Sequence, residues 1–422
     1  MRKKILAGIL AVVMLITMMP GNMMEKAGIE SEVEAAVTLQ NPRISSDSSL
    51  ISGQKVTYDC VWFGSYPQTE IVAQASDSGL YVSNSTQNSD YEINANLYNT
   101  LVNTSDWSSS GDTVINGVKY RRISSSDAYE TASDNNHYNW NAKSGYHYFR
   151  YDKIKWRVLN VENGKAFLMA DQSLDARPYT ISSSKLTWET STTRTWLNDY
   201  FLSTAFLSSE QNGISMTQVI NADNLDHGTT GGNNTDDRIF LLSESELYTE
   251  NAIKYGFIAK NTFDDARYSY GSAYAKAMGL EYEKTKKTVA WWTRSPGETK
   301  YNPLLVGWSS YLNSYAYDYY KGVRPALYLD TSSSLYSYAG ILCTDGTMNE
   351  LGYASQDDNT STYTITYDAN GGSGAPEAQT KTAGRDLTLS STTPSKTGYI
   401  FVGWGMSKSA ITSTFTIGET YS

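Results

Sequence analysis

The sequence predicts an α+β fold, in which a mixed main domain with several short helices precedes a small β-rich unit. Runs of alternating apolar and polar residues, joined by Asn-Gly pairs, are typical of antiparallel hairpins. Short stretches between these runs place apolar residues at helical spacing. With 422 residues, 40% of them hydrophobic, the chain can bury a core in two or three domains.

The first residues have the pattern of a secretory signal peptide. Three basic residues at 2–4 precede an apolar run over 5–19, which is too short to span a bilayer comfortably. The site Val33-Glu34-Ala35, with Ala36 next, suits a signal peptidase, so we expect a signal peptide over residues 1–36; an uncleaved N-terminal anchor is the alternative. No later segment is apolar enough to cross a membrane. The sequence therefore predicts a secreted or cell-envelope location outside the cytoplasm.

Composition divides the rest of the chain into four parts. Residues 37–50 are polar and lack periodicity, so we expect a linker there. The aromatic and β-branched runs of the main domain extend over residues 51–332. A second polar stretch at 333–361 is interpreted as another linker, before a β unit at 362–422 that is small enough to be marginally stable alone.

The first half of the main domain is predicted to contain one strand, one helix and two hairpins. The strand covers residues 56–63, and Gly64 and Pro67 are expected to end it. A short helix is expected around 91–101. Asn-Gly supplies the positive φ angles of a type I′ turn, which predicts two hairpins: 114–120, with Asn116-Gly117, and 154–170, with Asn163-Gly164.

The second half of the main domain alternates short helices and strands. Thr192 or Thr193 can cap a helix in which Trp196 and Tyr200 recur at helical spacing. Further helices are expected at 208–214, 244–247 and 273–278, and strands at 238–242, 289–294 and 323–329.

The C-terminal unit carries a repeat pattern. Alternation predicts strands at 363–367, 387–389, 399–402 and 415–417. The pattern consists of Tyr367, Asn370-Gly371-Gly372, Pro394, Gly398-Tyr399-x-Phe401-x-Gly403-Trp404, Gly418 and Tyr421. In this order and spacing it resembles the internalin-type B repeat, also called the Listeria–Bacteroides repeat. The resemblance implies a small β-grasp-like module of bacterial surface proteins, with a spacing or adhesive role. Because the last strand of that family follows Tyr421, we expect the repeat to be truncated.

The main domain resembles an uncharacterised domain of exported proteins from clostridial-type bacteria. The blocks that carry this resemblance are Trp62-Phe63-Gly64-x-Tyr66-Pro67-Gln68, Ile154-x-Trp156-x-Val158-Leu159, Arg194-x-Trp196-Leu197-Asn198, Trp292-x-Arg294-Ser295-Pro296-Gly297 and Gly322-Val323-Arg324-Pro325-Ala326-Leu327. The last two blocks are also similar to the closing segments of sulfatase-modifying-factor domains, which implies a C-type-lectin-like α+β fold. The oxidase chemistry of that family needs two neighbouring cysteines near these segments, and Cys60 and Cys343 do not match that requirement.

Aromatic and arginine side chains near the closing strands are candidate ligand contacts. Trp292, Arg294, Trp308 and Arg324 could line a pocket, since sugar rings stack on aromatic faces and arginine offers planar donors. The alternative is structural, with Trp292 in the core and both arginines in ion pairs. Successive residues of a strand point to opposite faces, so at most one of Trp291 and Trp292 is expected in the core.

Five tyrosines crowd the segment over residues 311–320, and Tyr315 and Tyr317 are candidate ligand contacts. Tyrosine gives a large contact area at low entropic cost, as in adaptable recognition surfaces. A strand with one tyrosine face packed and the other exposed is the alternative, and either arrangement permits binding.

The two cysteines allow two interpretations. In an exported protein, Cys60 and Cys343 could form a disulfide that joins the two ends of the main domain. The alternative is two isolated buried thiols that behave as small apolar residues.

Metal and nucleic-acid binding find little support in the composition. Asn and Asp side chains in the loop over 221–237 are oxygen donors that suit Ca²⁺, but the EF-hand spacing is absent and a solvated turn-rich loop is the alternative. Three His and two Cys leave little material for a zinc site, so no cofactor is predicted. A net charge of −10 argues against nucleic acid as a partner.

We find no catalytic motif in the sequence: no nucleophile elbow, zinc-protease helix, P-loop or dinucleotide fingerprint. The sequence therefore predicts a non-enzymatic surface protein that binds an extracellular carbohydrate or protein ligand, or a cell-wall component. An enzyme acting on a surface polymer or protein is one alternative, because paired carboxylates can be far apart in sequence. A purely structural spacer is another.

Overall fold

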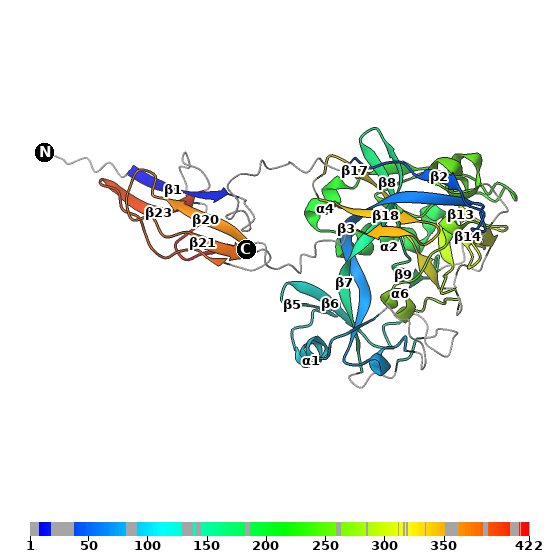
Figure 1. Cartoon of the computed structure of the whole chain (residues 1–422), viewed down its shortest axis with the longest axis horizontal. Coiled ribbons are helices and arrows are strands. Elements are labelled where there is room, and N and C mark those ends of the chain that lie inside the picture. Colours follow the sequence, from blue (N-terminus) through cyan, green and yellow to red (C-terminus); the bar gives the residue numbers. More distant parts are fainter. Residues whose placement is uncertain are drawn as a thin grey trace. The chain divides into compact units, whose positions relative to one another are not determined.

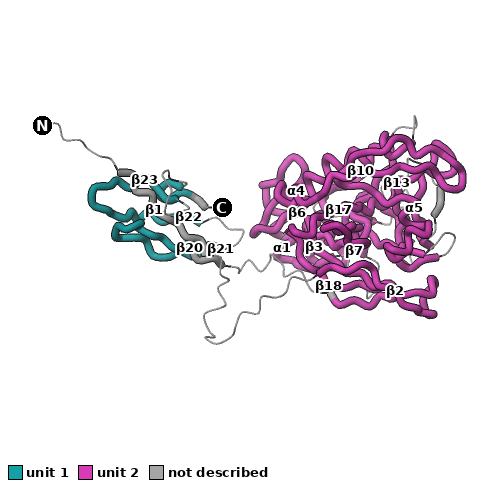
Figure 2. Tube along the Cα trace, turned by 90° about the horizontal axis from the view of Figure 1, so that it is seen from above, with its two compact units in different colours: residues 1–35, 354–422 teal, residues 36–353 magenta. Residues whose placement is uncertain are grey.

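Residues 8–17, 38–81, 91–128, 138–140, 145–181, 186–258, 263–283, 286–310, 312–314, 317, 320–333, 335–350, 362–382, 387–405, 413 and 415–421 are described by a computed structural model. The chain divides into two compact units (Figure 2). The first combines residues 1–35 with 354–422, and the second contains residues 36–353. Both are mostly β-sheet; the few short helices lie in the second unit, which is compatible with an α+β fold. The C-type-lectin-like fold stays a prediction.

The larger unit is built on an 11-stranded sheet whose main path runs β12-β17-β8-β7-β3-β18-β19. Its strands are β2 (Arg43–Ser46), β3 (Gln54–Val72), β4 (Tyr91–Ile93), β5 (Asp112–Ile115), β6 (Val118–Ile123), β7 (His147–Glu162), β8 (Lys165–Ala170), β12 (Ile239–Phe240), β17 (Ala326–Asp330), β18 (Ser337–Cys343) and β19 (Met348–Glu350). In Figure 1, the long strands β3 and β7 reach the end of the unit where β5, β6 and α1 lie.

Strand β3 is much longer than the sequence predicts, because Gly64 and Pro67 bend it without ending it. Gly64 has a φ of +68° and lies where the register with β7 shifts, between Trp62 and Ser65. A glycine at such a bulge adopts the left-handed conformation without steric cost. The strand therefore continues to Val72 and pairs with β4.

Both predicted hairpins are confirmed, as β5–β6 and β7–β8. Asn116 and Gly117 have φ angles of 52° and 83°, and Asn163 and Gly164 have 52° and 73°. These pairs of positive φ angles are what a type I′ turn requires, so the local sequence sets the register of each hairpin.

A second sheet has the order β15-β14-β13-β16-β9. Its strands are β9 (Asp175–Arg177), β13 (Trp291–Pro296), β14 (Pro303–Val306), β15 (Leu312–Ser314) and β16 (Lys321–Val323). A two-stranded pair joins β10 (Thr217–Val219) to β11 (Thr235–Asp237), so the last three residues of the loop predicted over 221–237 form a strand. The short strand β9 carries two of the cavity residues described below, Asp175 and Arg177.

The helices are short. They are α1 (Ala95–Asn103), α2 (Thr192–Trp196), α3 (Leu202–Ala205), α4 (Ser208–Gly213), α5 (Glu244–Tyr248) and α6 (Ala273–Ala277), with 3₁₀ turns η1 (Ala75–Asp77), η3 (Trp188–Thr190), η5 (Glu250–Tyr255) and η6 (Asp265–Arg267). Between α2 and α3 the helix widens to a π-helical turn, η4 (Leu197–Phe201). Ser191 caps α2 by accepting a hydrogen bond from the Arg194 amide, so the expected cap at Thr192 or Thr193 is wrong by one or two residues.

The two segments expected to be linkers contribute strands to the larger unit. Strand β2 pairs with β3 inside residues 37–50, and the Arg43 guanidinium bonds the Asp59 carboxylate. Strand β18, inside residues 333–361, pairs with β3 over six register positions. The boundary of this unit therefore lies near residue 353. The two strands escaped detection because each lies in a stretch that is polar on average, and β18 also depends on a partner that is distant in sequence.

The smaller unit has a four-stranded sheet in the order β21-β20-β1-β23 and a two-stranded pair, β22–β24. Its strands are β1 (Gly8–Thr17), β20 (Thr362–Asp368), β21 (Gln379–Thr382), β22 (Leu387–Thr388), β23 (Tyr399–Gly405) and β24 (Thr420–Tyr421). Ile365, Tyr367, Leu389 and Trp404 form its core. Strand β1 comes from the apolar run of the expected signal peptide, which stays a prediction.

Candidate functional site

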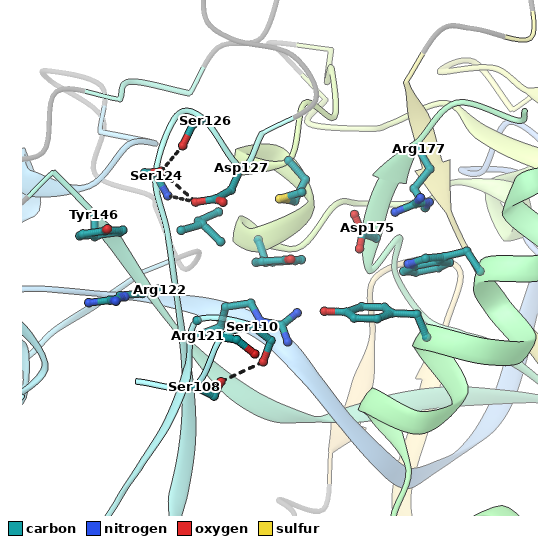
Figure 3. Close-up of a pocket in the computed structure, with 17 residues that line it drawn as sticks. Ser108, Ser110, Arg121, Arg122, Ser124, Ser126, Asp127, Tyr146, Asp175 and Arg177 are labelled. Carbon is teal, nitrogen blue, oxygen red and sulfur yellow. Dashed lines mark hydrogen bonds between the residues drawn. The ribbon is translucent and has the colours of Figure 1, made fainter. Parts of the chain in front are cut away.

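A solvent-open cavity of about 560 Å³ lies in the larger unit, and Figure 3 shows its lining. One wall comes from β6, the turn before β5 and the turn after β6, and the other comes from β9, the end of α2, the η4 turn and α6. The lining residues are Ser108, Ser109, Ser110, Gly111, Arg121, Arg122, Ile123, Ser124, Ser126, Asp127, Tyr146, Asp175, Arg177, Trp196, Tyr200, Tyr274 and Met278.

Arg121 is a buried arginine whose charge is already matched. Its Nε and Nη2 atoms donate to the two carboxylate oxygens of Asp112 at 2.8 and 2.9 Å. Burial would raise the pKa of Asp112, but the hydrogen bonds and charges of Arg121 and Lys119 outweigh it and lower that pKa. The Tyr151 hydroxyl donates to the same carboxylate at 3.0 Å. This bidentate pair fixes Arg121 at the pocket wall.

Arg122 is the next residue of β6 after Arg121, and its guanidinium has a different environment. Its guanidinium lies 4.8 Å from the ring centroid of Trp107 and 4.5 Å from that of Tyr146. We find no carboxylate partner for Arg122 among the residues that the structure describes. Stacking occupies the faces of a guanidinium and leaves its in-plane N–H groups available to an acceptor.

Asp175 on β9 is a buried carboxyl at the cavity. Its Oδ2 accepts a hydrogen bond from the Tyr66 hydroxyl at 2.7 Å, and its Oδ1 accepts one from the Ala176 amide at 2.7 Å. Burial raises the pKa of Asp175, although the positive charge of Arg177 and the Tyr66 hydrogen bond oppose the rise. Burial also raises the pKa of Tyr66 well above its ordinary value, so Tyr66 stays a neutral donor.

An aromatic wall closes the β9 side of the cavity. The Trp196 and Tyr200 rings stack with centroids 6.2 Å apart, and the Arg177 guanidinium lies 4.6 Å from the Trp196 centroid. Trp196 is nearly buried, whereas Tyr200 is 40% exposed. The η4 turn places Tyr200 four residues after Trp196 on this wall. An exposed tyrosine on a fixed tryptophan is a flat, rigid surface that a ligand ring can contact.

Serine hydroxyls line the β6 side of the cavity. Ser108 and Ser110 share a hydrogen bond of 2.9 Å, and Ser124 bonds both Ser126 and the Asp127 carboxylate (Figure 3). Each hydroxyl can donate and accept, so this side presents adaptable polar groups opposite the aromatic wall.

The aromatic residues predicted near the closing strands are buried away from this cavity. Trp291 and Trp292 are both fully buried, so the expectation that at most one would be core is wrong. The reason is that the second sheet is covered on both faces. Trp292 donates from Nε1 to the Arg177 carbonyl at 2.9 Å, and Trp291 donates to the Arg267 carbonyl. Trp292 thus holds the backbone of β9 through this hydrogen bond and does not line the cavity.

The predicted arginines have structural surroundings. Arg294 is 5% exposed and makes a bidentate pair with Glu246, with distances of 2.6 and 3.0 Å. Arg324 is fully buried and donates to the carbonyls of Ala170 and Asp171 at 2.8 and 3.0 Å. Arg294 therefore fits the ion-pair alternative; Arg324 differs from it, because its hydrogen bonds go to backbone carbonyls.

The remaining predicted contacts also lie outside the cavity lining. Trp308 and Tyr317 are half-buried and pack against the main core, and the Tyr317 carbonyl accepts a hydrogen bond from the Tyr179 amide. Tyr315 lies outside the described residues.

Cys60 and Cys343 are buried free thiols, so the disulfide alternative is not formed in the structure. They lie on the paired strands β3 and β18, but Cys60 is opposite Gly340 and Cys343 is opposite Thr57. This offset separates the two thiols by three register positions, which is too far for a bridge. Burial raises the pKa of Cys60 to about 12, which makes its thiol unreactive.

The loop considered for Ca²⁺ uses its side chains to hold its own backbone. Asn224 Oδ1 accepts from the amides of Asp226 and His227, and Asn221 Nδ2 donates to the Asn233 carbonyl. Within the described ranges, no three His, Cys, Asp or Glu side chains gather as metal ligands would.

Sequence reasoning missed the pocket arginines and Asp175. The resemblance blocks did contain Tyr66 and Trp196, and both support the cavity. A usable signal was the adjacent pair Arg121-Arg122 in an acidic chain. Nothing local connects this pair to β9, because the two segments meet only through tertiary packing.

Two stretches of the chain match known families. Residues 163–331 match a domain of unknown function, DUF6273, and residues 363–422 match the Listeria-Bacteroides repeat domain. The first match contains Asp175, Arg177 and the aromatic wall, and the second confirms the predicted repeat. Curated proteins and solved structures yielded no match.

The repeat identifies a class of protein: it is typical of surface or extracellular bacterial proteins. Across the described ranges, we see no helix with the length and apolar character needed to cross a membrane.

Proposed function

We propose that this chain is a secreted or cell-envelope protein whose main domain binds an extracellular carbohydrate, without enzymatic activity. The observation that carries this proposal is the cavity, in which an exposed aromatic surface faces arginine and serine donors. Its volume of about 560 Å³ falls in the range of small-molecule sites, roughly 300–1,000 Å³. The repeat would act as a spacer or adhesive module beside this domain.

The chemistry of the two walls favours a sugar over a flat apolar ligand. Tyr200 offers a ring face to the apolar face of a pyranose. Ser108, Ser110 and Ser126 offer hydroxyls that can donate or accept with sugar hydroxyls. Arg177, oriented by its stacking on Trp196, adds planar donors. A glycan of the cell wall is one candidate ligand, and an extracellular protein is the alternative.

A glycan array probed with the chain tests this proposal. We expect binding to a subset of glycans, and Tyr200→Ala should weaken that binding about tenfold, since ring contacts contribute on the order of 1 kcal/mol. Tyr301→Ala is the matched control, because Tyr301 is 49% exposed and does not line the cavity. Absence of binding to any glycan, or equal losses in the two variants, would contradict the proposal.

An enzyme acting on a surface polymer is the second candidate, and Asp175 is the observation that favours it. A buried carboxyl with a raised pKa at a cavity is the kind of group that serves as a general acid. If the bound glycan is cleaved or modified by the chain, and Asp175→Asn abolishes this while binding persists, the enzyme proposal replaces the binding protein.

A further inference from the structure

The cavity is lined by more positive than negative side chains, in a chain whose net charge is −10. Its three arginines are Arg121, Arg122 and Arg177, and its two carboxyl groups are Asp127 and Asp175. Arg121 is paired with Asp112, whereas Arg122 has no carboxylate partner among the described residues, so positive charge remains at the cavity of an acidic chain. A site built for a neutral sugar would not need this charge.

The arginines are spread along the cavity. Figure 3 shows Arg122 beside Tyr146 at one end, Arg177 near Asp175 at the other, and Arg121 between them. They come from two strands, β6 and β9, that are far apart in the sequence. Positive groups at separate points along an open cavity fit a ligand with anionic groups on more than one of its units.

Arg122 has more hydrogen-bonding capacity left for a ligand than Arg121 has. Arg121 already spends two donors on Asp112. Arg122 has rings of Trp107 and Tyr146 near its guanidinium and, among the described residues, no carboxylate partner. Its fork is therefore oriented before any ligand arrives, which reduces the entropic cost of bidentate binding to a carboxylate.

The carboxyl groups at the cavity oppose an anion only weakly. Asp127 accepts hydrogen bonds from both the amide and the hydroxyl of Ser124, which spreads its negative charge. Burial raises the pKa of Asp175 and so favours its neutral form. Both features reduce the repulsion that an incoming carboxylate would meet.

We propose that the ligand is an acidic oligosaccharide with uronic-acid-type carboxylates, one of which binds the Arg122 fork while its rings contact Tyr200. This inference rests on the proposed function and names its ligand class. A neutral glycan of the same length lacks the groups that would use the Arg122 fork.

Isothermal titration calorimetry on the chain, with an oligogalacturonate and the matching neutral oligogalactoside as probes, tests the inference. We expect the acidic probe to bind at least about tenfold more tightly, and added salt to weaken it. Arg122→Gln should weaken the acidic probe by about tenfold to a hundredfold, which corresponds to one charge-assisted interaction, and leave the neutral probe unchanged. The affinity of Arg122→Lys for the acidic probe should lie between those of the unsubstituted chain and Arg122→Gln, because lysine keeps the charge and loses the fork.

Arg43→Gln is the control, because it removes one arginine that does not line the cavity and should leave both affinities unchanged. Equal binding of the two probes would overturn the acidic-ligand inference and leave the proposed carbohydrate binding intact. Binding of an acidic peptide in place of either saccharide would overturn the saccharide assignment. If the chain binds no probe and no array glycan, the inference and the proposed function both fail.

Discussion

Two clusters in the larger unit contain the same residue types but differ in how much of their side-chain surface is exposed. The closing strands bring Trp291, Trp292, Arg294 and Arg324 together, and all four are at most 5% exposed. The cavity also brings tryptophan, tyrosine and arginine together, but there Tyr200 is 40% exposed. In the first cluster both arginines bind fixed protein acceptors, although Arg294 Nε and Arg324 Nη1 are buried without a hydrogen-bond partner among the described residues. In the second cluster, ring surface is open to solvent.

This difference teaches that residue type alone does not mark a binding site. Arg294 and Arg122 are both arginines near aromatic rings, yet Arg294 has a bidentate partner in Glu246. What distinguishes the cavity is that its ring surface is exposed and its hydrogen-bonding groups line a space open to solvent. Such exposure depends on the tertiary fold.

The largest expected effect is on the free energy of unfolding, and it comes from the buried cluster of Trp291, Trp292, Arg294 and Arg324. Glu246→Ala leaves the buried Arg294 without its carboxylate partner, and removing one member of a buried pair costs about 3–5 kcal/mol. Urea unfolding of the chain measures this loss. Glu246→Gln, which keeps the shape and one acceptor, should lose less. A loss below about 1 kcal/mol in Glu246→Ala would show that the closing strands do not depend on this pair.

A smaller effect is expected from the pH dependence of stability at the cavity. The carboxyl of Asp175 has a pKa raised above its ordinary value of 3.8, mainly by burial. Its contribution is therefore fully present below pH 3.8 and is lost as the pH rises through the raised value. Four groups face it and must stay unchanged in the comparison: Tyr66 from β3, Arg121 from β6, Arg177 from β9 and Tyr274 from α6.

Asp175→Asn removes this titration. Relative to the unsubstituted chain, the variant should gain stability as the pH rises from about 4 toward neutrality, because the buried charge no longer forms. Unfolding curves at several pH values give the difference. If the two chains keep a constant difference in free energy of unfolding across this window, Asp175 does not titrate as its burial implies.

The smallest expected effect on the free energy of unfolding comes from the cavity residues. Among the described residues, Arg122→Gln removes contacts with the rings of Trp107 and Tyr146, so we expect a loss of at most about 1 kcal/mol in the free energy of unfolding. The same urea experiment measures it beside Glu246→Ala. A loss as large as that of the Glu246 variant would mean that Arg122 is structural, and the contrast between the two clusters would disappear.

Local features of the sequence predicted local structure well. The turns at Asn116-Gly117 and Asn163-Gly164 were predictable because two adjacent residues decide their geometry. The C-terminal repeat was predictable because its glycines and aromatics recur in a fixed order. Strand β18 was not, since it is short, lies in a stretch that is polar on average, and pairs with a strand that is distant in sequence.

The cavity was beyond prediction for the same physical reason. Arg122 and Arg177 belong to strands in different sheets, and Tyr200 belongs to a π-helical turn between two short helices. Their proximity depends on how these elements pack, which alternation and spacing do not encode. The sequence suggested a site at Trp292, Arg294 and Arg324, but these side chains are buried and serve the packing of the larger unit.

A crystal structure of the chain with a bound oligogalacturonate tests the central claim most directly. The account predicts sugar density in the cavity, with a ring against Tyr200 and a carboxylate on the fork of Arg122. Density at any other surface, with this cavity holding no sugar, would contradict it.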